Sequence, residues 1–204
     1  MPRSLKVASA IAMVAGCMLA AGSPASASSC PSTATQVIGL SQSQMEGSIA
    51  CLINEERAAY GLSPVAPNEA LRQAALSHSN EMVAQGYFEH TSPAGVTFVD
   101  RIEATGYTRR ARVWEVGENL VWGTGPLSTP QSLVTSWMNS PPHRENLLRA
   151  RFREIGIAAV VGTPRSPVEA TGVTVSSEYG YRAYSKTKKR KRGKGKARKS
   201  HRRH

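Results

Sequence analysis

Three stretches of this sequence decide its fold: Phe88-Glu-His-Thr-Ser-Pro93, Gly117-Glu-Asn119 and Trp137-Met-Asn-Ser-Pro-Pro-His-Arg-Glu-Asn146. Each places a His or a Glu among turn-forming or aromatic residues. A chain that brought the three together would hold a His/Glu cluster in a cleft. The sequence therefore predicts a binding or active site assembled from segments that lie far apart along the chain.

Four helices are predicted from capping signals followed by apolar residues at helical spacing. Gly61 and Gly86 mark the ends of the first two, since glycine is favoured just past a helix C-terminus. The signals at the four starts are Ser43-Gln-Met-Glu46, Asn68, Thr97 with Asp100, and Thr129-Pro130, and the fourth helix is expected to run through Trp137.

Three strands are predicted between and after these helices. Residues 112–122 alternate loosely between apolar and polar, residues 155–161 form a continuous apolar run, and residues 171–181 alternate again. Segment 162–167 contains Pro, Gly and Ser and is a turn, so the last two strands are predicted to pair antiparallel. Helices before and between the strands indicate a sheet covered by helices.

The three stretches together resemble the signature of the CAP superfamily, the cysteine-rich secretory, antigen 5 and pathogenesis-related 1 proteins, in its bacterial branch. The resemblance runs from about Ile49 to Tyr181 and places a CAP domain, also called an SCP domain, at residues 45–184, after an N-terminal segment at 28–44. It implies an α+β fold, a three-layer α-β-α sandwich with a mainly antiparallel central sheet. Further matches are Leu52-Ile-Asn-Glu-Glu-Arg57, Ala74-Ala-Leu-Ser-His-Ser79 and Ile155-Gly-Ile157.

Residues 1–27 have the features of a secretory signal peptide. Two basic residues precede an apolar run over 7–21 that is too short for a membrane span, and Ala25-Ser-Ala27 offers a small-residue cleavage site. A buried N-terminal helix is the less favoured alternative. A second export route stays open, because Val14-Ala-Gly-Cys17 resembles a bacterial lipobox whose cysteine is acylated. We expect a secreted, extracellular protein that associates with the envelope.

Export also bears on the three cysteines. Cys17 would leave with the signal peptide, so Cys30 and Cys51 would remain as an even pair in an oxidising compartment. We expect them to form one disulfide, which closes a loop of about 20 residues and contributes roughly 3 kcal/mol on the chain-entropy model. Two free thiols are the competing interpretation and would be unusual outside the cell.

Residues 185–204 form a basic tail that differs from the rest of the chain. From Lys186 to His204 there are twelve Lys or Arg and no acid, whereas the other 14 basic residues match all 14 acids. A block of like charge repels itself and buries nothing, so the tail is predicted to be disordered. Its expected partners are anionic cell-envelope polymers, anionic membrane surfaces or extracellular DNA. The tail has no interleaved aromatic residue, so no specific nucleic-acid recognition is expected.

The family's cleft usually carries two His and two Glu. By the resemblance, His90 matches the first His, and Glu118 matches the Glu of the Gly-Glu-Asn stretch. The other two positions depart from the animal and plant pattern, because Ser140 stands near the place of the second Glu and Thr174-Val175 stands where the last strand would carry a His. His143 is the expected bacterial substitute.

His90, Glu118 and His143 are therefore the expected cluster. Two imidazoles and one carboxylate suit zinc or another divalent metal with an open fourth position. A metal-free cluster, in which Glu118 hydrogen-bonds both imidazoles, is an equal alternative. Glu145 is a further cleft candidate or a solvated acid at a helix end. His78 lies on an apolar stripe and is expected to be a buried histidine with satisfied hydrogen bonds.

The remaining polar and aromatic residues of the motifs are expected to be structural. Asn119 is predicted to hydrogen-bond the backbone, Trp137 to lie in the core, and Asn146 to cap a helix or bridge a loop. Arg57 and Arg144 are predicted to hold loops through carboxylate pairs or to contact an anionic ligand.

Two classes of function remain open. In the first, the protein is a secreted binding module whose cleft takes a metal, a lipid or another small molecule, while the tail holds it at an anionic surface. In the second, it is a metal-assisted hydrolase of a cell-wall or extracellular substrate, with Glu118 as base or orienting group. The sequence contains no Gly-x-Ser-x-Gly and no His-Glu-x-x-His. The binding module, a monomer, is therefore favoured.

Overall fold

The computed structural model of the protein describes residues 29–185. The predicted signal peptide, the alternative lipobox at Cys17 and the basic tail from Lys186 onward lie outside the described residues and stay predictions. Within residues 29–185, no helix is both long enough and apolar enough to cross a membrane.

The described chain forms five α-helices, and four of them are those that the sequence predicted. The Ser41 side chain accepts a hydrogen bond from the Gln44 backbone and so caps the first helix. The predicted start at Ser43 was therefore wrong by two residues. The caps at Asn68, Thr97 and Thr129 are confirmed. The helices are α1 Gln42–Ala59, α2 Glu69–Gln85, α3 Phe98–Ala104, α4 Pro130–Met138 and α5 Pro141–Leu147, and 3-10 turns lie at Val37–Gly39 and Gly125–Ser128.

Helix α5 was not predicted. It has seven residues and begins with Pro141 and Pro142, which suit a first helical turn because its N–H groups need no partner within the helix. Two prolines in a row signal a loop when they are read alone. The consequence for the site is that His143 lies in the first turn of a helix.

Four strands form one sheet in the order β1-β3-β4-β2. The last three strands of the chain are those predicted, and β4 pairs antiparallel with both β2 and β3. The short strand β1 was not predicted, and it pairs parallel with β3. The sheet is therefore mixed, with antiparallel pairing dominant. The strands are β1 Ala66–Pro67, β2 Val113–Thr124, β3 Glu154–Val161 and β4 Gly172–Ala183.

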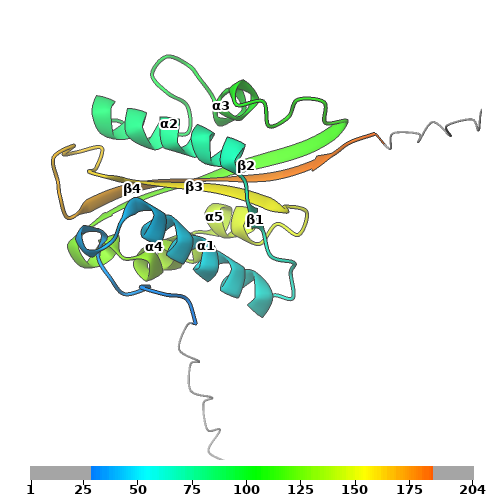
Figure 1. Ribbon diagram of the computed structural model, residues 1–204. Coiled ribbons are helices and arrows are strands. Elements are labelled where there is room, and N and C mark those ends of the chain that lie inside the picture. Colours follow the sequence, from blue (N-terminus) through cyan, green and yellow to red (C-terminus); the bar gives the residue numbers. More distant parts are fainter. Residues whose placement is uncertain (1–28, 186–204) are drawn as a thin grey trace, which may run out of the picture.

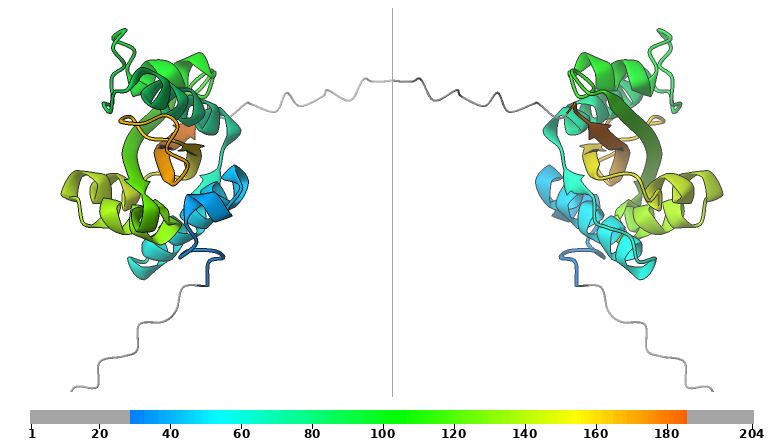
Figure 2. Two further views of the ribbon diagram at one scale, coloured as in Figure 1. Left: turned by 90° about the vertical axis from the view of Figure 1, so that its left-hand side faces the viewer. Right: turned by 90° about the vertical axis from the view of Figure 1, so that its right-hand side faces the viewer.

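The sheet lies between two layers of helices, as the resemblance implied. Figure 1 shows α2 and α3 on one side of the sheet and α1, α4 and α5 on the other. The end-on views in Figure 2 show the same separation. Because successive residues of a strand point to opposite faces, each residue of β2 or β4 contacts one helical layer or the other.

The larger core lies on the α1/α4 side. It buries Ile49, Trp137, Phe152 and Tyr179, and the Trp137 indole N–H donates to the Leu120 carbonyl at 3.0 Å. A smaller cluster of Leu71, Ala74, Ile102 and Tyr107 lies under α2 and α3. The predicted core position of Trp137 is confirmed.

The predicted Cys30–Cys51 disulfide is present. It joins the segment before α1 to the middle of that helix, across 21 residues of sequence. The N-terminal end of the described chain is thereby fixed to the core.

Arg57 holds loops in a different way from the one expected. Its side chain is fully buried and donates to backbone carbonyls, among them those of Ser63, Leu147 and Phe152. The predicted carboxylate partner is replaced by carbonyl oxygens, which satisfy the fork of guanidinium donors as well. Arg57 therefore fixes the turn after α1 and the segment between α5 and β3.

Strand β1 pairs with only Glu154 and Ile155, so the rest of the outer edge of β3 has no strand partner among the described residues. Farther along this edge, the Glu46 carboxylate of α1 accepts a hydrogen bond from the Ala159 backbone N–H at 3.3 Å. Arg72 of α2 donates to the same carboxylate at 2.8 Å. An ion pair thus bridges α1 and α2 across the sheet edge.

Candidate functional site

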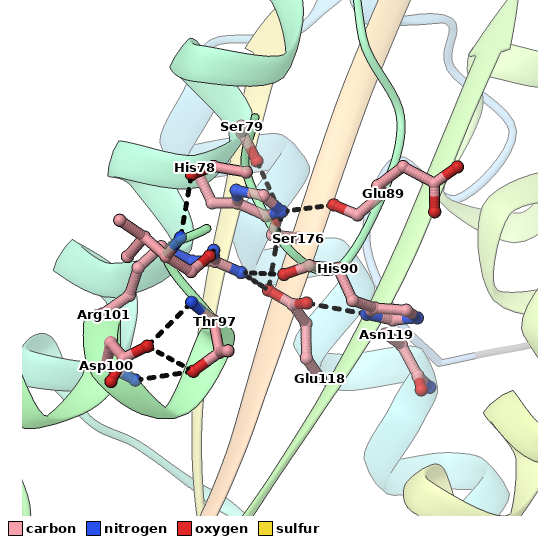
Figure 3. Close-up of polar contacts among 12 residues, drawn as sticks. His78, Ser79, Glu89, His90, Thr97, Asp100, Arg101, Glu118, Asn119 and Ser176 are labelled. Carbon is pink, nitrogen blue, oxygen red and sulfur yellow. Dashed lines mark hydrogen bonds and ion pairs between the residues drawn. The ribbon is translucent and has the colours of Figure 1, made fainter. Parts of the chain in front are cut away.

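The site is built around Glu118, in the middle of β2. Its side chain points toward α2 and is fully buried. One carboxylate oxygen, Oε1, accepts from His90 Nδ1 at 2.7 Å, and the other, Oε2, accepts from Arg101 Nη2 at 2.7 Å. Figure 3 shows Glu118 between these two partners. Both oxygens of the predicted carboxylate are therefore engaged.

Arg101 was not predicted as part of the site. It comes from α3, its side chain is 5% exposed, and its guanidinium also donates to the backbone carbonyls of His90 and Val96. It therefore neutralises Glu118 and at the same time anchors the loop between α2 and α3. Burial alone would raise the pKa of Glu118, but the hydrogen bond from His90, the neighbouring Glu178 carboxyl and the charge of Arg101 lower it below its usual range.

His90 lies in that loop with its side chain 52% exposed. The hydrogen bond to Glu118 raises the pKa of His90, because the carboxylate favours the imidazolium form. Nδ1 is used by this bond, so Nε2 is the ring nitrogen left for an incoming group. The predicted contact between His90 and Glu118 is confirmed by the structure.

His78 is the buried histidine that the sequence predicted, and it also belongs to the site. Its Nε2 lies 2.9 Å from the Glu89 carbonyl oxygen and 3.9 Å from Glu118 Oε2. Burial lowers the pKa of His78, so the ring is neutral and donates to the carbonyl. The side chain supports the loop that carries His90 (Figure 3).

Glu178 is the second residue that the sequence did not reveal. It lies on β4 directly opposite Glu118 in the antiparallel register, and its side chain is completely buried. Neither of its carboxylate oxygens has a hydrogen-bond partner of normal geometry within the described chain. Burial, followed by the charge of Glu118, raises the pKa of Glu178 well above its usual range. Glu178 is therefore the carboxyl of this pair that holds the proton.

His143 lies on α5, which two asparagine hydrogen bonds join to β2 at the cluster. The Asn119 side-chain amide donates to the His143 carbonyl at 2.8 Å, and Asn146 donates to the Glu118 carbonyl at 3.1 Å. The predicted backbone hydrogen bond of Asn119 is confirmed, whereas Asn146 links α5 to β2 instead of capping a helix or bridging a loop. Burial, followed by the positive charge of His90, lowers the pKa of His143. Thus the His143 imidazole is affected by the charge of His90.

The close approach of α5 to β2 is favoured by a glycine at position 117. A Cβ atom there would lie 2.9 Å from Asn146 Oδ1 and 3.1 Å from Phe152 Cζ. The glycine of the Gly-Glu-Asn stretch therefore makes room for the asparagine that links the two motifs.

The ligand atoms of the three predicted metal ligands, His90, Glu118 and His143, do not all lie within 4.8 Å of one another. In the described chain, the only three His, Cys, Asp or Glu residues with ligand atoms within 4.8 Å of one another are Cys30, Cys51 and Glu55, and both cysteines are in the disulfide. His143 Nδ1 lies 2.8 Å from the Ser140 hydroxyl, which leaves its Nε2 open. Any metal at His90 and His143 would therefore need further ligands from outside the trio.

Glu145 lies away from the buried cluster. Its side chain is 74% exposed and pairs with Arg149 at 3.3 Å, one helical turn on. Arg144 lies over the Tyr60 ring and donates to its hydroxyl. These two residues have the contacts of surface side chains.

One cavity of roughly 390 Å³ lies outside this site. It is lined by Glu46, Arg72, Asn68 and the start of β3, on the far edge of the sheet from β2. None of the predicted site residues lines it. We give it less weight than the cluster, because its charged groups pair with each other.

Comparisons with known proteins agree with the fold and its motifs. The model of the CAP family, described as the cysteine-rich secretory protein family, matches residues 51–176. In Bacillus subtilis (strain 168), "Uncharacterized protein YkwD" is 34% identical over 146 residues, which cover 69% of this chain and 54% of that protein. "Uncharacterized membrane protein YlbC" is 28% identical over 118 residues, which cover 57% of this chain and 32% of that protein. The chain thus spans about half of the first relative's length and about a third of the second's.

Two solved structures resemble the described chain. An outer surface protein from Borrelia burgdorferi has a TM-score of 0.54 at 21% identity, covering 66% of this chain and 90% of that one. An extracellular protein containing an SCP domain from Bacillus anthracis str. Ames has a TM-score of 0.50 at 24% identity, covering 69% of this chain and 43% of that one. At these identities the likeness shows the fold alone.

Proposed function

Because this chain belongs to the CAP family of cysteine-rich secretory proteins, we propose that it is an extracellular binding module whose His/Glu cleft takes a divalent metal such as zinc, or a small ligand. One observation carries the proposal: a buried carboxylate holds His90 by Nδ1 and directs its other nitrogen outward. A carboxylate behind an imidazole is the usual support of a metal-binding histidine.

In this proposal the ligands are the Nε2 atoms of His90 and His143. Glu118 acts behind His90 instead of binding metal itself, since both of its oxygens are occupied. Two imidazoles suit zinc, with the remaining positions open to water or to a ligand from solution. Metal requires neutral imidazole, which the lowered pKa of His143 favours and the raised pKa of His90 opposes. We therefore expect binding to strengthen as the pH rises.

The hydrolytic alternative depends on those open positions. Zinc would supply a water of lowered pKa there. Hydrolysis of purified wall polymer by the zinc-loaded protein, lost in His143→Ala, would favour it.

Location and surface attachment are part of the same proposal. Two proteins of similar fold are named an outer surface protein and an extracellular protein, which supports an extracellular place for this chain. The Lys-rich tail is proposed to hold the protein at an anionic envelope polymer or membrane surface by charge.

Calorimetric zinc titration tests the cleft. His201 and His204 are first replaced by Gln in every version of the protein, so that the tail contributes no imidazole. We then expect His90→Ala or His143→Ala to abolish the remaining binding. Glu118→Gln should weaken it about 10- to 100-fold, as is usual for the partner behind a ligand. Zinc binding that survives both histidine substitutions would refute a metal site in this cleft.

A further inference from the structure

The arginines of the folded domain gather at one end of the sheet. This basic end consists of residues 103–115, 145–154 and 180–185, which the chain brings together where β2 begins and β4 ends (Figure 1). It carries seven of the twelve arginines in residues 29–185 but only four of the 14 acids. The arginines are Arg109, Arg110, Arg112, Arg149, Arg151, Arg153 and Arg182.

Three of these seven are neutralised by acids. Arg149 and Arg151 pair with Glu115, and Arg182 pairs with Glu154. By contrast, the three arginines just before β2 are exposed and form no ion pair with any described residue: Arg109, Arg110 and Arg112. An unpaired charge cluster on an otherwise balanced domain is a binding surface for a polyanion.

Apolar side chains lie exposed beside these arginines. Val113 is 44% exposed and Trp114 38%, at the start of β2, and Tyr184 is 54% exposed, just past the end of β4. The two strand ends are adjacent, because the Arg112 backbone N–H donates to the Ala183 carbonyl at 2.8 Å. Aromatic and apolar residues next to arginines match the interface of a lipid bilayer, whereas a hydrophilic polyanion would leave them without a partner.

We propose that Arg109, Arg110 and Arg112, with Val113, Trp114 and Tyr184, form a docking surface for an anionic lipid bilayer. The chain continues from this end into the Lys-rich segment that begins at Lys186. Two modest attachments at one place bind a membrane far better than either does alone. The basic end is therefore a second contact that adds to the tail.

The remaining charges orient the domain. Ten of the 14 acids lie outside the basic end, together with five of the twelve arginines. The described chain outside the basic end is therefore net negative and is repelled by an anionic surface, while the basic end is attracted. The domain is therefore expected to stand with its basic end on the bilayer and the long axis of the sheet pointing away from the membrane.

Vesicle binding with Trp114 as a reporter tests the proposal. Protein exported by its own host is mixed with vesicles of phosphatidylglycerol and phosphatidylcholine, with and without brominated acyl chains that quench tryptophan. One variant replaces Arg109, Arg110 and Arg112 by Gln. The control variant removes three positive charges from the tail instead, by replacing Lys194, Lys196 and Lys199 with Gln. A third variant, Trp114→Phe, identifies which tryptophan is quenched.

We expect wild type and the tail control to show quenching of Trp114 at saturating vesicles, and the arginine variant to lose it. Each basic residue near an anionic membrane contributes roughly fivefold to binding, so the arginine variant should partition on the order of a hundredfold less. No Trp114 quenching in saturated wild type would overturn the proposal. The proposal would also be overturned if the arginine variant and the tail control showed equal Trp114 quenching and equal vesicle partitioning. Binding to soluble anionic wall polymer without binding to vesicles would overturn it as well.

Discussion

Two carboxylate clusters lie on the same face of the sheet, and they differ in how completely they are paired. Glu154 accepts from Tyr107 and Asn68 at 2.7 Å each and from Arg182 at 3.1 and 3.2 Å. At the other cluster, Glu118 is paired in the same thorough way. Its neighbour Glu178, however, is buried without a hydrogen bond of normal geometry among the described residues.

The difference separates a structural cluster from a functional one. A partly buried carboxylate with all its partners rigidifies the fold, as Glu154 does where it ties β3 to β4 and to α2. Two adjacent carboxyls that share one arginine are costly, because one of them must keep a proton. Such costs concentrate at binding and active sites. The difference in hydrogen bonding thus identifies the cluster of Glu118 and Glu178, and not that of Glu154, as the candidate site.

The largest effect is expected from removing the buried cation. Arg101→Ala leaves the buried Glu118 carboxylate with only the half-exposed His90 as a partner, which should lower the free energy of unfolding by about 3–5 kcal/mol at pH 7. In the other cluster, Arg182→Ala removes a side chain that is 24% exposed and should cost only about 1–2 kcal/mol. Urea unfolding measures both. Arg101→Lys is the control that keeps the charge, and equal losses at the two sites would contradict the comparison.

A Glu→Gln substitution should change the free energy of unfolding in opposite directions at Glu178 and at Glu154. The pKa of Glu178 is raised, so its contribution to stability is full below the unfolded-state pKa, about 4.3, and is lost as the pH rises through the raised value. Glu178→Gln removes this loss, because an amide does not ionise in this pH range. We expect a gain of about 1 kcal/mol or more at pH 8 and little change at pH 4.

Glu154→Gln is the matched case. The pKa of Glu154 is lowered by hydrogen bonds from Tyr107 and Arg182 that outweigh its burial, so its contribution is present above pH about 4.3 and is lost as the pH falls. The substitution should therefore cost about 1–2 kcal/mol at pH 7. A loss of stability in Glu178→Gln at pH 8 would mean that this carboxyl has a partner in solution.

A smaller effect is expected in the titration of the histidines. In an NMR titration, His90 should titrate above the usual value of about 6.5 and His78 and His143 below it. The contribution of His90 to stability is accordingly full at low pH and is lost as the pH rises through its raised pKa. Glu118→Gln should return the pKa of His90 toward normal. An unshifted His90 in the unsubstituted protein would argue against the Glu118 contact.

The smallest effect is expected at Glu145. Because it is exposed and forms a single pair with Arg149, Glu145→Ala should change the free energy of unfolding by less than about 0.5 kcal/mol. Zinc affinity should also be unchanged. A clear loss of zinc affinity would return Glu145 to the cleft.

The sequence predicted most of the fold because caps and alternation are local signals. Asn68 and Thr97 lie at helix starts as expected, and the three longer strands have the predicted alternation or apolar run. The two elements that it missed, β1 and α5, are short. The two residues of β1 are too few to show an alternation of apolar and polar side chains. The two prolines that begin α5 resemble a turn in the sequence.

The site was predicted only as far as the motifs reach. His90 and Glu118 meet, whereas Arg101 and Glu178 come from α3 and β4, whose places depend on tertiary packing. One signal for Glu178 was available. It is the only acid in β4, on the same face as Thr174 and Ser176, and so toward α2. No local pattern marked Arg101.

The ion pair across the edge of β3 has a consequence for self-association. An uncovered strand edge offers free N–H groups to a strand of another molecule, which is how many sheets aggregate. Here the Glu46 carboxylate takes one such N–H, at Ala159, and Arg72 keeps that carboxylate in place. An incoming strand would have to break the pair and bury a charge beside it. The bridge between α1 and α2 thereby disfavours the pairing of this edge with a strand of another molecule.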